Sequence, residues 1–373
     1  MSARSLRIAQ VTPSLRGGGL ERLVRDLALA LASRGHTPAV FCMNGLGTYA
    51  DELTGAGVQV FDCREGRIRL RGYPAALIRA LRAFDPDVIH AHSGTWLAAS
   101  VAKSRLGRPR LVFTDHGRYP PEPWIRGRIE RWCHRRTDGL VAVTPALARY
   151  DREYLNLPDE PRVVLNGIDL GPYAANGTGV RDRLRREWGV AATDVLALAI
   201  GRFAPVKNYE GMLRALAAAR VEAPALKLAI LGSGAGEEAA RTLASELGIA
   251  DAVTFLGFRR DVADCLRAAD FFLNASHTEA LPVSLLEAMA AGIPTVAPRV
   301  GGIPDALGDP PAGLLVAPGD TASLAGALVR ITRDAPARQA LGALARRHAA
   351  RFSLDTFVNN YCAVYDSVME RRA

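Results

Sequence analysis

The sequence predicts an α/β protein with two domains, each built on a parallel sheet. Short apolar segments alternate with amphipathic helical segments along the whole chain, which is the pattern of parallel β/α units. Glycine, proline and asparagine accumulate between residues 166 and 179, and the pattern starts again at residues 195–200. With 373 residues, of which 49% are hydrophobic, the chain is long enough to bury two cores. We therefore expect domains at residues 1–170 and 171–354.

The first half contains six segments that predict parallel strands. They are rich in aliphatic residues and cover residues 6–11, 38–43, 58–61, 87–91, 111–114 and 140–143. After the first segment, apolar residues recur at helical spacing from Leu20 to Leu31, and Gly35 ends the pattern. Because parallel sheets bind ligands beyond the carboxyl ends of their strands, the loops after these segments are the candidate positions for a site.

The second half repeats the pattern with strand segments at residues 195–200, 227–231, 253–256, 271–274 and 295–297. Good helix formers over residues 283–291 predict a helix, which Gly292 and Pro294 stop. The last segment, residues 352–372, is also predicted to be helical. Its apolar side contains Phe357, Tyr361, Val364 and Tyr365.

Cysteine usage and hydropathy predict a cytoplasmic protein. The five cysteines are scattered without a Cys-x-x-Cys pair, which favours reduced thiols over a zinc site or a disulfide framework. The sequence enters a strand directly, without a signal-peptide pattern. Its apolar runs stay below the ~20 residues that a membrane-spanning helix needs.

The positive charge is concentrated in the first half. Residues 1–172 contain 25 lysines and arginines against 17 aspartates and glutamates, a net charge of +8, whereas residues 173–373 carry +1. Such a face suits an anionic membrane or a phosphate-bearing substrate. Nucleic acid is disfavoured, since the arginines are not interleaved with stacking aromatic residues.

Two arginine-rich stretches refine the membrane hypothesis. The first contains Arg64, Arg67, Arg69, Arg71, Arg79 and Arg82 with Leu77, Ile78 and Leu81, and the second contains Arg126, Arg128, Arg131, Arg135 and Arg136 with Trp124, Ile125 and Trp132. Basic side chains beside Trp and Ile are typical of an interfacial patch. We therefore expect peripheral attachment to the inner membrane face, with a solvated basic surface as the alternative.

A glycine-rich loop follows the first predicted strand. Gly17, Gly18 and Gly19 join that strand to a helix, an arrangement that cradles phosphate. It lacks the dinucleotide fingerprint, since Arg22 stands where the third glycine belongs, and no Gly-Lys-Ser/Thr of a P-loop follows. A dehydrogenase is therefore disfavoured, and a tight turn without a ligand remains the alternative.

Residues 277–305 carry two glutamates around a predicted helix start. Glu279 precedes the helix, Pro282 sits at its first turn, and Glu287 lies inside it. Carboxylates placed this way are ~8–12 Å apart along the axis, too far to act on one bond but suited to two hydroxyl-bearing parts of one ligand. The helix start between them favours an anion. The alternative is a dipole-complementing charge and a solvated helix face.

Cations and histidines stand at other strand ends. Arg202 and Lys207 flank a strand-to-helix turn, where two positive charges oppose the helix dipole unless an anion lies between them. His92 and His116 follow two buried strands of the first half. Each histidine points to ligand binding at the sheet edge or to a structural role.

Taken together, these blocks resemble glycosyltransferase family 4. The resemblance rests on Pro-Ser-x-x-Gly-Gly, Pro86-Asp87-Val-Ile-His-Ala-His92, Asp115-His116-Gly117, Asn166-Gly-Ile-Asp169, Gly201-Arg202 with Lys207-Asn208, Gly232-Ser-Gly234, Phe255-Leu-Gly257, and Pro-x-x-x-x-Glu-Ala-x-Ala-x-Gly-x-Pro after Glu279. It implies a GT-B fold of two Rossmann-like domains facing across a cleft, with a C-terminal helix at residues 355–373 packing back on the first domain.

The resemblance also implies a reaction. A retaining transferase would move a hexose-type sugar from a nucleotide diphosphate sugar, UDP being expected and GDP the alternative, without a metal or other cofactor. The acceptor would be a glycan, as in polysaccharide biosynthesis, a lipid-linked molecule or a small molecule. Preorganised Arg and Lys donors suit this chemistry because a leaving diphosphate gains charge in the transition state.

Residue roles follow from the same resemblance. The catalytic residues implied are Arg202 and Lys207 at the diphosphate and Glu279 and His116 at the transferred sugar. The donor-binding residues implied are Gly18, Gly201, Gly232, Phe258, Arg259, Ala280, Leu281, Pro282, Val283 and Glu287, the last at the ribose. The acceptor-side residues are Gly17, Gly19, His92 and Asp115.

Two alternatives stay open at this point. A nucleotide-sugar epimerase on the same fold would need no separate acceptor, and a non-catalytic subunit would bind the nucleotide sugar without turnover. Ala280-Leu281 depart from the glycine and bulky residue that many family members carry after the glutamate, which leaves the sugar selectivity open.

Overall fold

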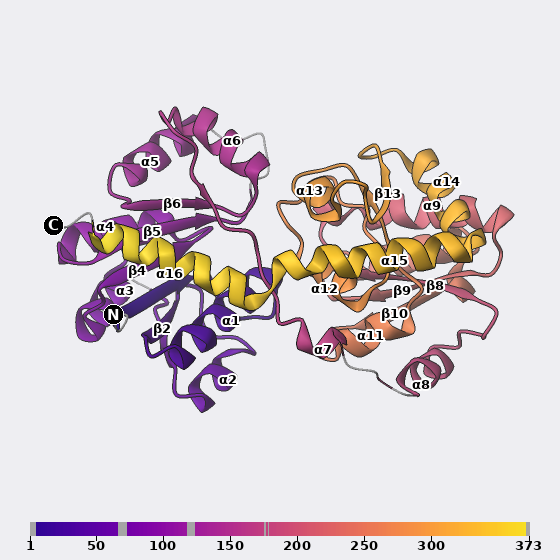
Figure 1. The fold of residues 1–373 in the computed structure, drawn as a ribbon, viewed down its shortest axis with the longest axis horizontal. Coiled ribbons are helices and arrows are strands. Elements are labelled where there is room, and N and C mark those ends of the chain that lie inside the picture. The colour runs from indigo at the N-terminus through magenta and orange to yellow at the C-terminus, as the bar shows by residue number, and fades with distance from the viewer. Residues whose placement is uncertain (1–4, 66–72, 118–123, 175–176, 178, 371–373) are drawn as a thin grey trace. The chain divides into compact units, whose positions relative to one another are not determined.

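The chain folds into two compact units, as a computed structural model that describes residues 5–65, 73–117, 124–174, 177 and 179–370 shows (Figure 1). The first unit comprises Met1–Ile168 and Leu354–Ala373, and the second comprises Asp169–Ser353. The domain boundaries expected from the sequence lie within two residues of these. The connection is therefore short, at the end of the Asn166-Gly167-Ile168-Asp169 block.

The first unit is built on a seven-stranded parallel sheet with the order β3-β2-β1-β4-β5-β6-β7. The strands are β1 (Arg7–Thr12), β2 (Thr37–Cys42), β3 (Gln59–Asp62), β4 (Val88–His92), β5 (Arg110–Asp115), β6 (Gly139–Ala142) and β7 (Arg162–Val163). The helices are α1 (Gly19–Ser33), α2 (Ala50–Gly55), α3 (Ala75–Phe84), α4 (Trp96–Leu106), α5 (Trp124–His134), α6 (Pro145–Leu155) and α16 (Leu354–Glu370). The predicted parallel β/α pattern of this half is confirmed.

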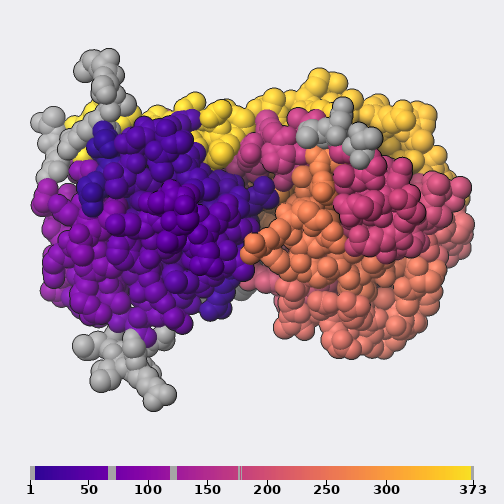
Figure 2. Space-filling model, turned by 90° about the horizontal axis from the view of Figure 1, so that it is seen from below, coloured from indigo at the N-terminus to yellow at the C-terminus, as the bar shows by residue number. Residues whose placement is uncertain are grey.

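The C-terminal helix α16 belongs to the first unit. It packs against α1 and β5, and the yellow atoms of the chain's end lie beside the indigo N-terminal segments (Figure 2). The expected apolar side is the buried one: Phe357, Tyr361, Val364 and Tyr365 are at most 3% exposed. This burial attaches the end of the chain to the sheet from which the chain began.

The second unit has a six-stranded parallel sheet with the order β10-β9-β8-β11-β12-β13. The strands are β8 (Val195–Ile200), β9 (Leu226–Leu231), β10 (Val253–Gly257), β11 (Phe271–Leu273), β12 (Thr295–Pro298) and β13 (Gly313–Val316). The helices include α7 (Gly171–Ala174), α8 (Val180–Glu187), α9 (Tyr209–Glu222), α10 (Glu237–Glu246), α11 (Val262–Ala268), α12 (Val283–Ala291), α13 (Ile303–Leu307), α14 (Thr321–Arg333) and α15 (Ala335–Ala349).

Strand order explains where polar loops gather. In the first sheet, chain order reverses between β1 and β4, so the loops that leave these strands diverge to opposite sides. In the second sheet, the same reversal lies between β8 and β11. Both reversals leave room beyond the carboxyl ends, where the glycine-rich loop after β1 and the Arg202 loop after β8 begin.

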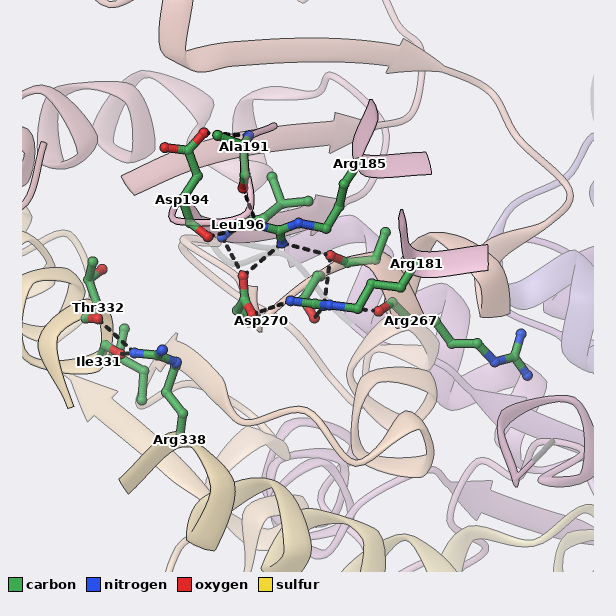
Figure 3. A network of polar contacts seen from close by, with 12 residues as sticks. Arg181, Arg185, Ala191, Asp194, Leu196, Arg267, Asp270, Ile331, Thr332 and Arg338 are labelled. Carbon is green, nitrogen blue, oxygen red and sulfur yellow. Dashed lines mark hydrogen bonds and ion pairs between the residues drawn. The ribbon is translucent and has the colours of Figure 1, made fainter. Parts of the chain in front are cut away.

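Two arginines lock the amino end of the second sheet (Figure 3). Arg181 and Arg185 of α8 both bind the carboxylate of Asp270, at 2.6 and 3.0 Å, and both donate to the last carbonyl groups of α11. Asp270 also accepts from the backbone N–H of Leu196 in β8, at 2.7 Å. This cluster supplies partners for carbonyls that a helix end leaves unpaired, and it joins α8, α11 and β8.

The described helices include none whose length and apolar character would let it cross a bilayer. All five cysteines are free thiols, and four of them are buried.

Candidate active site

One group of predicted site residues assembles at the carboxyl ends of β8 and β11. Arg202 and Lys207 lie in the loop after β8, and Glu279 lies in the loop between β11 and α12. Because β8 and β11 are neighbours in the sheet, the two loops leave from the same edge. The second unit thus brings Lys207 into contact with Glu279, 72 residues away in sequence, while Arg202 stands in the same loop as Lys207.

Glu279 is held by three donors, all on its Oε1 atom. Lys207 Nζ lies 2.5 Å away, Ser276 Oγ 2.7 Å and Asn274 Nδ2 3.3 Å. Ser276 is itself fixed, since its backbone N–H donates to Asn274 Oδ1 at 2.8 Å. Sequence reasoning missed Asn274 and Ser276, although both directly follow the buried strand β11. This carboxylate is oriented before any ligand binds.

Arg202 differs from Lys207 in its surroundings. It is exposed, and within the described part of the chain its guanidinium makes no ion pair. Lys207 uses one ammonium proton on Glu279 and keeps two donors for other partners. The predicted anion site therefore contains Lys207, which is already paired with a carboxylate, and Arg202, which is available to a ligand.

Glycines let the neighbouring loops approach the Arg202 loop. Gly232 has φ +152°, and a Cβ atom there would lie 2.0 Å from the carbonyl oxygen of Gly201. A Cβ atom on Gly234, at φ +155°, would collide with the backbone of Phe203. The predicted donor-side residue Gly232, and Gly234 beside it, thus have a steric reason to be glycine, whereas a Cβ atom on Gly201 would make only ordinary contacts at 3.4 Å.

The start of α12 carries the other predicted donor contacts. Pro282 is the N-cap residue and not part of the first turn, a correction of one position; a proline side chain cannot cap the free N–H groups that follow. Gly302 N–H donates to Ala280 O at 2.6 Å, and a Cβ atom on Gly301 would lie 1.6 Å from Glu279 O. The Gly301–Gly302 turn therefore fixes the backbone of residues 279–280. Leu281 follows in the loop, and Val283 is the first residue of the helix.

Glu287 is buried in the second turn of α12. It is 3% exposed and accepts a 2.6 Å hydrogen bond from the hydroxyl of Tyr173 in α7. A solvated helix face, the alternative suggested by the sequence, is therefore wrong for this residue. Tyr173 was missed because it lies in the segment rich in glycine, proline and asparagine before α8, where nothing in the pattern distinguishes it.

Phe258 and Arg259 follow β10. The Phe258 side chain is 49% exposed, while Arg259 binds Asp261 at 2.5 Å and Glu187 at 3.3 Å. The hydrogen bonds that Arg259 donates to the Asp261 carboxylate raise the pKa of the Arg259 guanidinium above its ordinary value. Arg259 is therefore anchored by carboxylates, and Phe258 is the part of this pair that offers an open apolar face.

A second group of predicted residues lies at the carboxyl ends of β4 and β5 in the first unit. His116 Nε2 lies 3.0 Å from His92 Nδ1, and His92 Nε2 lies 3.2 Å from Gln10 Oε1. His92 is 2% exposed, with both ring nitrogens engaged. The prediction that its side chain faces an acceptor is therefore wrong, because no ring nitrogen is left to meet one.

Asp115 also has an internal role. It is 3% exposed, and its Oδ1 accepts from Gly117 N–H at 2.9 Å and from Ser93 Oγ at 3.4 Å. Ser93 Oγ in turn accepts from His116 N–H at 2.8 Å. The predicted acceptor contact of this carboxylate is thus replaced by a role in shaping the turn that presents His116.

Behind these residues, His90 connects the sheet to the last helix. Its ring nitrogens lie 2.8 Å from both Tyr365 Oη and Thr114 Oγ1, and Thr114 Oγ1 lies 3.0 Å from Tyr361 Oη. Burial lowers the pKa of His90 and of His116 to about 3, and that of His92 well below its ordinary value. The cluster is therefore neutral at physiological pH.

The glycine-rich loop precedes α1 as predicted. Gly17 has φ +99°, Gly18 is the N-cap residue and Gly19 is the first residue of the helix. The Glu21 carboxylate lies against Gly18, since a Cβ atom there would be 2.4 Å from Glu21 Oε2. A phosphate at this helix start would have to displace the Glu21 side chain, because both are anions that complement the dipole.

Comparison with known proteins assigns the chain to a family. Residues 17–171 match the model described as Glycosyltransferase Family 4, and residues 180–348 match that of glycosyl transferases group 1. The D-inositol 3-phosphate glycosyltransferase of Thermomonospora curvata is 33% identical over 93% of this chain and 90% of its own length. The chain belongs to glycosyltransferase family 4.

Other similarities agree with this family 4 assignment. The N-acetyl-alpha-D-glucosaminyl L-malate synthase of Bacillus anthracis is 28% identical over 96% of this chain and 95% of its own. Anabaena HepE in complex with UDP and glucose superimposes with a TM-score of 0.84 at 22% identity, over 96% of this chain and 98% of that structure. The protein is a glycosyltransferase with two Rossmann-like domains of the GT-B type, as the sequence resemblance implied.

Proposed function

We propose that this glycosyltransferase moves a hexose-type sugar from a UDP-sugar to a small hydroxylated acceptor, with retention at the anomeric carbon and without a metal ion. The observation that carries the proposal is the Lys207–Glu279 ion pair at the carboxyl edge of the second sheet, with the exposed Arg202 in the same loop as Lys207. A diphosphate placed there would complete the cluster. GDP is the alternative nucleotide.

The leaving group explains the need for two cations. When the sugar–phosphate bond breaks, the diphosphate gains negative charge, and preorganised donors lower the barrier most at that point. Arg202 forks onto phosphate oxygens and Lys207 adds a point charge. The uncapped N–H groups at the start of α12 contribute partial positive charge beside them. These groups can together take the place of a divalent cation.

The remaining residues are assigned to the sugar and the nucleoside. Glu279 takes hydroxyl groups of the transferred sugar, and its Lys207, Ser276 and Asn274 contacts hold it for that task. Glu287 takes the ribose hydroxyls, as a buried carboxylate in the second turn of α12, the helix whose start faces the diphosphate. His116 is assigned to the transferred sugar, as the family resemblance implies.

The acceptor class follows from the relatives and the charge. Inositol 3-phosphate and malate, which appear in the relatives' names, are both small, anionic and hydroxylated. The net charge of +8 in residues 1–172 suits such an acceptor. We therefore place a small hydroxylated anion ahead of a glycan or a lipid-linked acceptor.

A panel of nucleotide sugars tests the donor assignment. Thermal shift of the purified protein in EDTA is expected to rise with one UDP-sugar, and the Arg202→Ala variant is expected to lose most of that shift. A shift only with GDP-sugars would change the nucleotide, and a shift with none would contradict the donor site.

Product analysis separates the two enzyme classes. Incubation of the preferred donor with and without inositol phosphates or hydroxy acids is expected to give a glycoside only with acceptor. An altered nucleotide sugar without acceptor would identify an epimerase, and binding without any product would identify a non-catalytic subunit.

Attachment to an anionic membrane is a second proposal, carried by α5. Trp124 is 75% exposed, Ile125 48% and Ile129 38%, and exposed arginines surround them at positions 128, 131 and 135. Such a helix inserts apolar side chains among lipids while its arginines meet anionic headgroups. Of the first predicted stretch, Arg67, Arg69 and Arg71 lie outside the described residues.

Vesicle sedimentation tests this attachment. Binding to anionic vesicles only, lost near 0.5 M salt where screening acts within ~4 Å, would support it. Trp124→Ser with Ile125→Ser should weaken it, while Leu97→Ser, at an exposed position in α4, should not. Equal failure to bind both vesicle types at low salt would contradict it.

A further inference from the structure

Gln10, His92 and His116 form a chain of hydrogen bonds, referred to below as the file, in which His92 contacts both of the others. Gln10 comes from β1, His92 ends β4 and His116 follows β5, so three adjacent strands contribute one residue each. Gln10 is 0% and His92 2% exposed. Neither side chain reaches solvent, so any effect on a ligand must pass through His116.

The chemistry of neutral imidazole gives this file a direction. A neutral ring has one N–H donor and one acceptor nitrogen, so the bond between His92 and His116 requires that one ring donates and the other accepts. In the orientation in which Gln10 Oε1 faces His92 Nε2, at 3.2 Å, that nitrogen carries the proton. His92 Nδ1 is then the acceptor, and His116 Nε2 donates to it at 3.0 Å.

We propose that Gln10 and His92 are positioning residues that hold His116 in the tautomer with a bare Nδ1, ready to accept a hydrogen bond from a hydroxyl of the transferred sugar. The inference rests on the proposed contact of His116 with the sugar. Within the described part of the chain, His116 Nδ1 has no hydrogen-bond partner of its own, which leaves this nitrogen for a ligand.

The backbone supplies the rest of the orientation. His116 N–H donates to Ser93 Oγ, and Asp115 Oδ1 accepts from Gly117 N–H, so the turn is fixed on both sides of the imidazole. Rotation of the ring about its side-chain bonds is what remains, and the bond to His92 restrains it. The backbone contacts thus set the position of His116, and the contact with His92 sets which of its ring nitrogens carries the proton.

Gln10 Nε2 is buried without a hydrogen-bond partner. If the amide were rotated, Nε2 would donate to His92, and each later donor would become an acceptor, so that His116 Nδ1 would carry a proton. The proton location on His116 therefore reports the direction of the whole file.

The experiment compares a relay variant with a matched control. His92→Leu removes the hydrogen-bond partner of His116. His92→Asn places an amide near the position of the His92 Nδ1 atom. Tyr365→Phe, the control, removes a hydroxyl that contacts His90 in the same buried cluster and leaves the file intact. With a UDP-sugar donor, His92→Leu should lower kcat about 10- to 100-fold with little change in donor KM. His92→Asn should recover much of it, and Tyr365→Phe should change kcat less than about 2-fold while lowering Tm.

Nitrogen-15 NMR of histidine-labelled protein supplies a readout that a structural role alone would not move. Wild type should show His116 protonated at Nε2 and bare at Nδ1, and His92→Leu should show a tautomer mixture. A protonated Nδ1 in wild type, or equal kcat losses in His92→Leu and Tyr365→Phe, would overturn the inference. Because NMR needs no donor, the absence of turnover in wild type would instead count against the proposed function.

Discussion

The second unit contains two clusters of cations and carboxylates, and they lie at opposite ends of the same strands. At the amino end, Arg181 and Arg185 saturate Asp270 and the end of α11, and the Arg185 side chain is 7% exposed (Figure 3). At the carboxyl end, Lys207 meets Glu279, and Arg202 remains exposed. Similar residue types form a closed network at one edge and an open one at the other.

This difference suggests that the closed network stabilises the fold and that the open cluster binds a ligand. A closed network leaves no charge for a ligand, and removing one member takes hydrogen-bond partners away from the groups that remain. An open cluster costs stability when empty, because like charges face a helix start, and a bound anion relieves that cost. Mutations at the amino edge should therefore lower the free energy of unfolding, whereas mutations at the carboxyl edge should lower kcat.

Breaking the closed cluster should have the largest effect, and it should fall on stability. Arg185→Met is expected to lower the free energy of unfolding by ~3–5 kcal/mol, because the partly buried Asp270 and three backbone carbonyl groups would each lose a donor. Urea denaturation followed through the nearby Trp188 measures it. Arg183→Met is the control, since Arg183 is exposed on the same helix with a 3.8 Å contact to Glu187. Equal stability of the two variants would contradict the structural role.

Mutations in the open cluster should lower the catalytic rate. Arg202→Ala and Lys207→Ala are each expected to lower kcat at least about 100-fold, equivalent to ~2.7–4 kcal/mol of transition-state stabilisation. Arg214→Ala is the control, since this exposed arginine of α9 pairs only with Glu210 among the described residues. Near-normal turnover in both site variants would remove them from the diphosphate site.

The sequence predicted every strand except β7 and β13, together with the helix after Glu279 and the residues of the open edge, because apolar periodicity and helix stops act locally. Asn274 and Ser276 escaped prediction because their role depends on strands that are neighbours only in the folded sheet. His92 and Asp115 were placed at the acceptor because strand ends usually face ligands. Packing against Gln10 and Ser93 instead directs them inward.

The two glutamates should separate by kinetic parameter, with a smaller effect. Glu287→Gln is expected to raise the donor KM about 10-fold, because a ribose contact acts in the ground state and the transition state alike. Glu279→Gln should mainly lower kcat. Calorimetric titration with free UDP checks this: unchanged UDP affinity in Glu287→Gln would refute the ribose assignment.

The histidine cluster of the first unit can be tested through the pH dependence of stability. Burial lowers the pKa values of His90, His92 and His116, so below the unfolded value of ~6.5 the unfolded chain binds protons that the folded chain does not. Stability should therefore fall as pH decreases from 6.5 toward 3, by ~1.4 kcal/mol per pH unit for each histidine. Urea midpoints at pH 7, 6 and 5 measure this, and a constant midpoint would contradict it.

The central claim is sugar transfer driven by the open cluster, and the anomeric configuration of the product tests it most directly. Proton NMR would follow the reaction of the preferred UDP-α-sugar with its acceptor in excess EDTA, for wild type and for Arg202→Ala. We predict an α-linked product from wild type at an unreduced rate in EDTA, and nearly none from the variant. A β-linked product, or strict dependence on Mg²⁺ or Mn²⁺, would contradict the account.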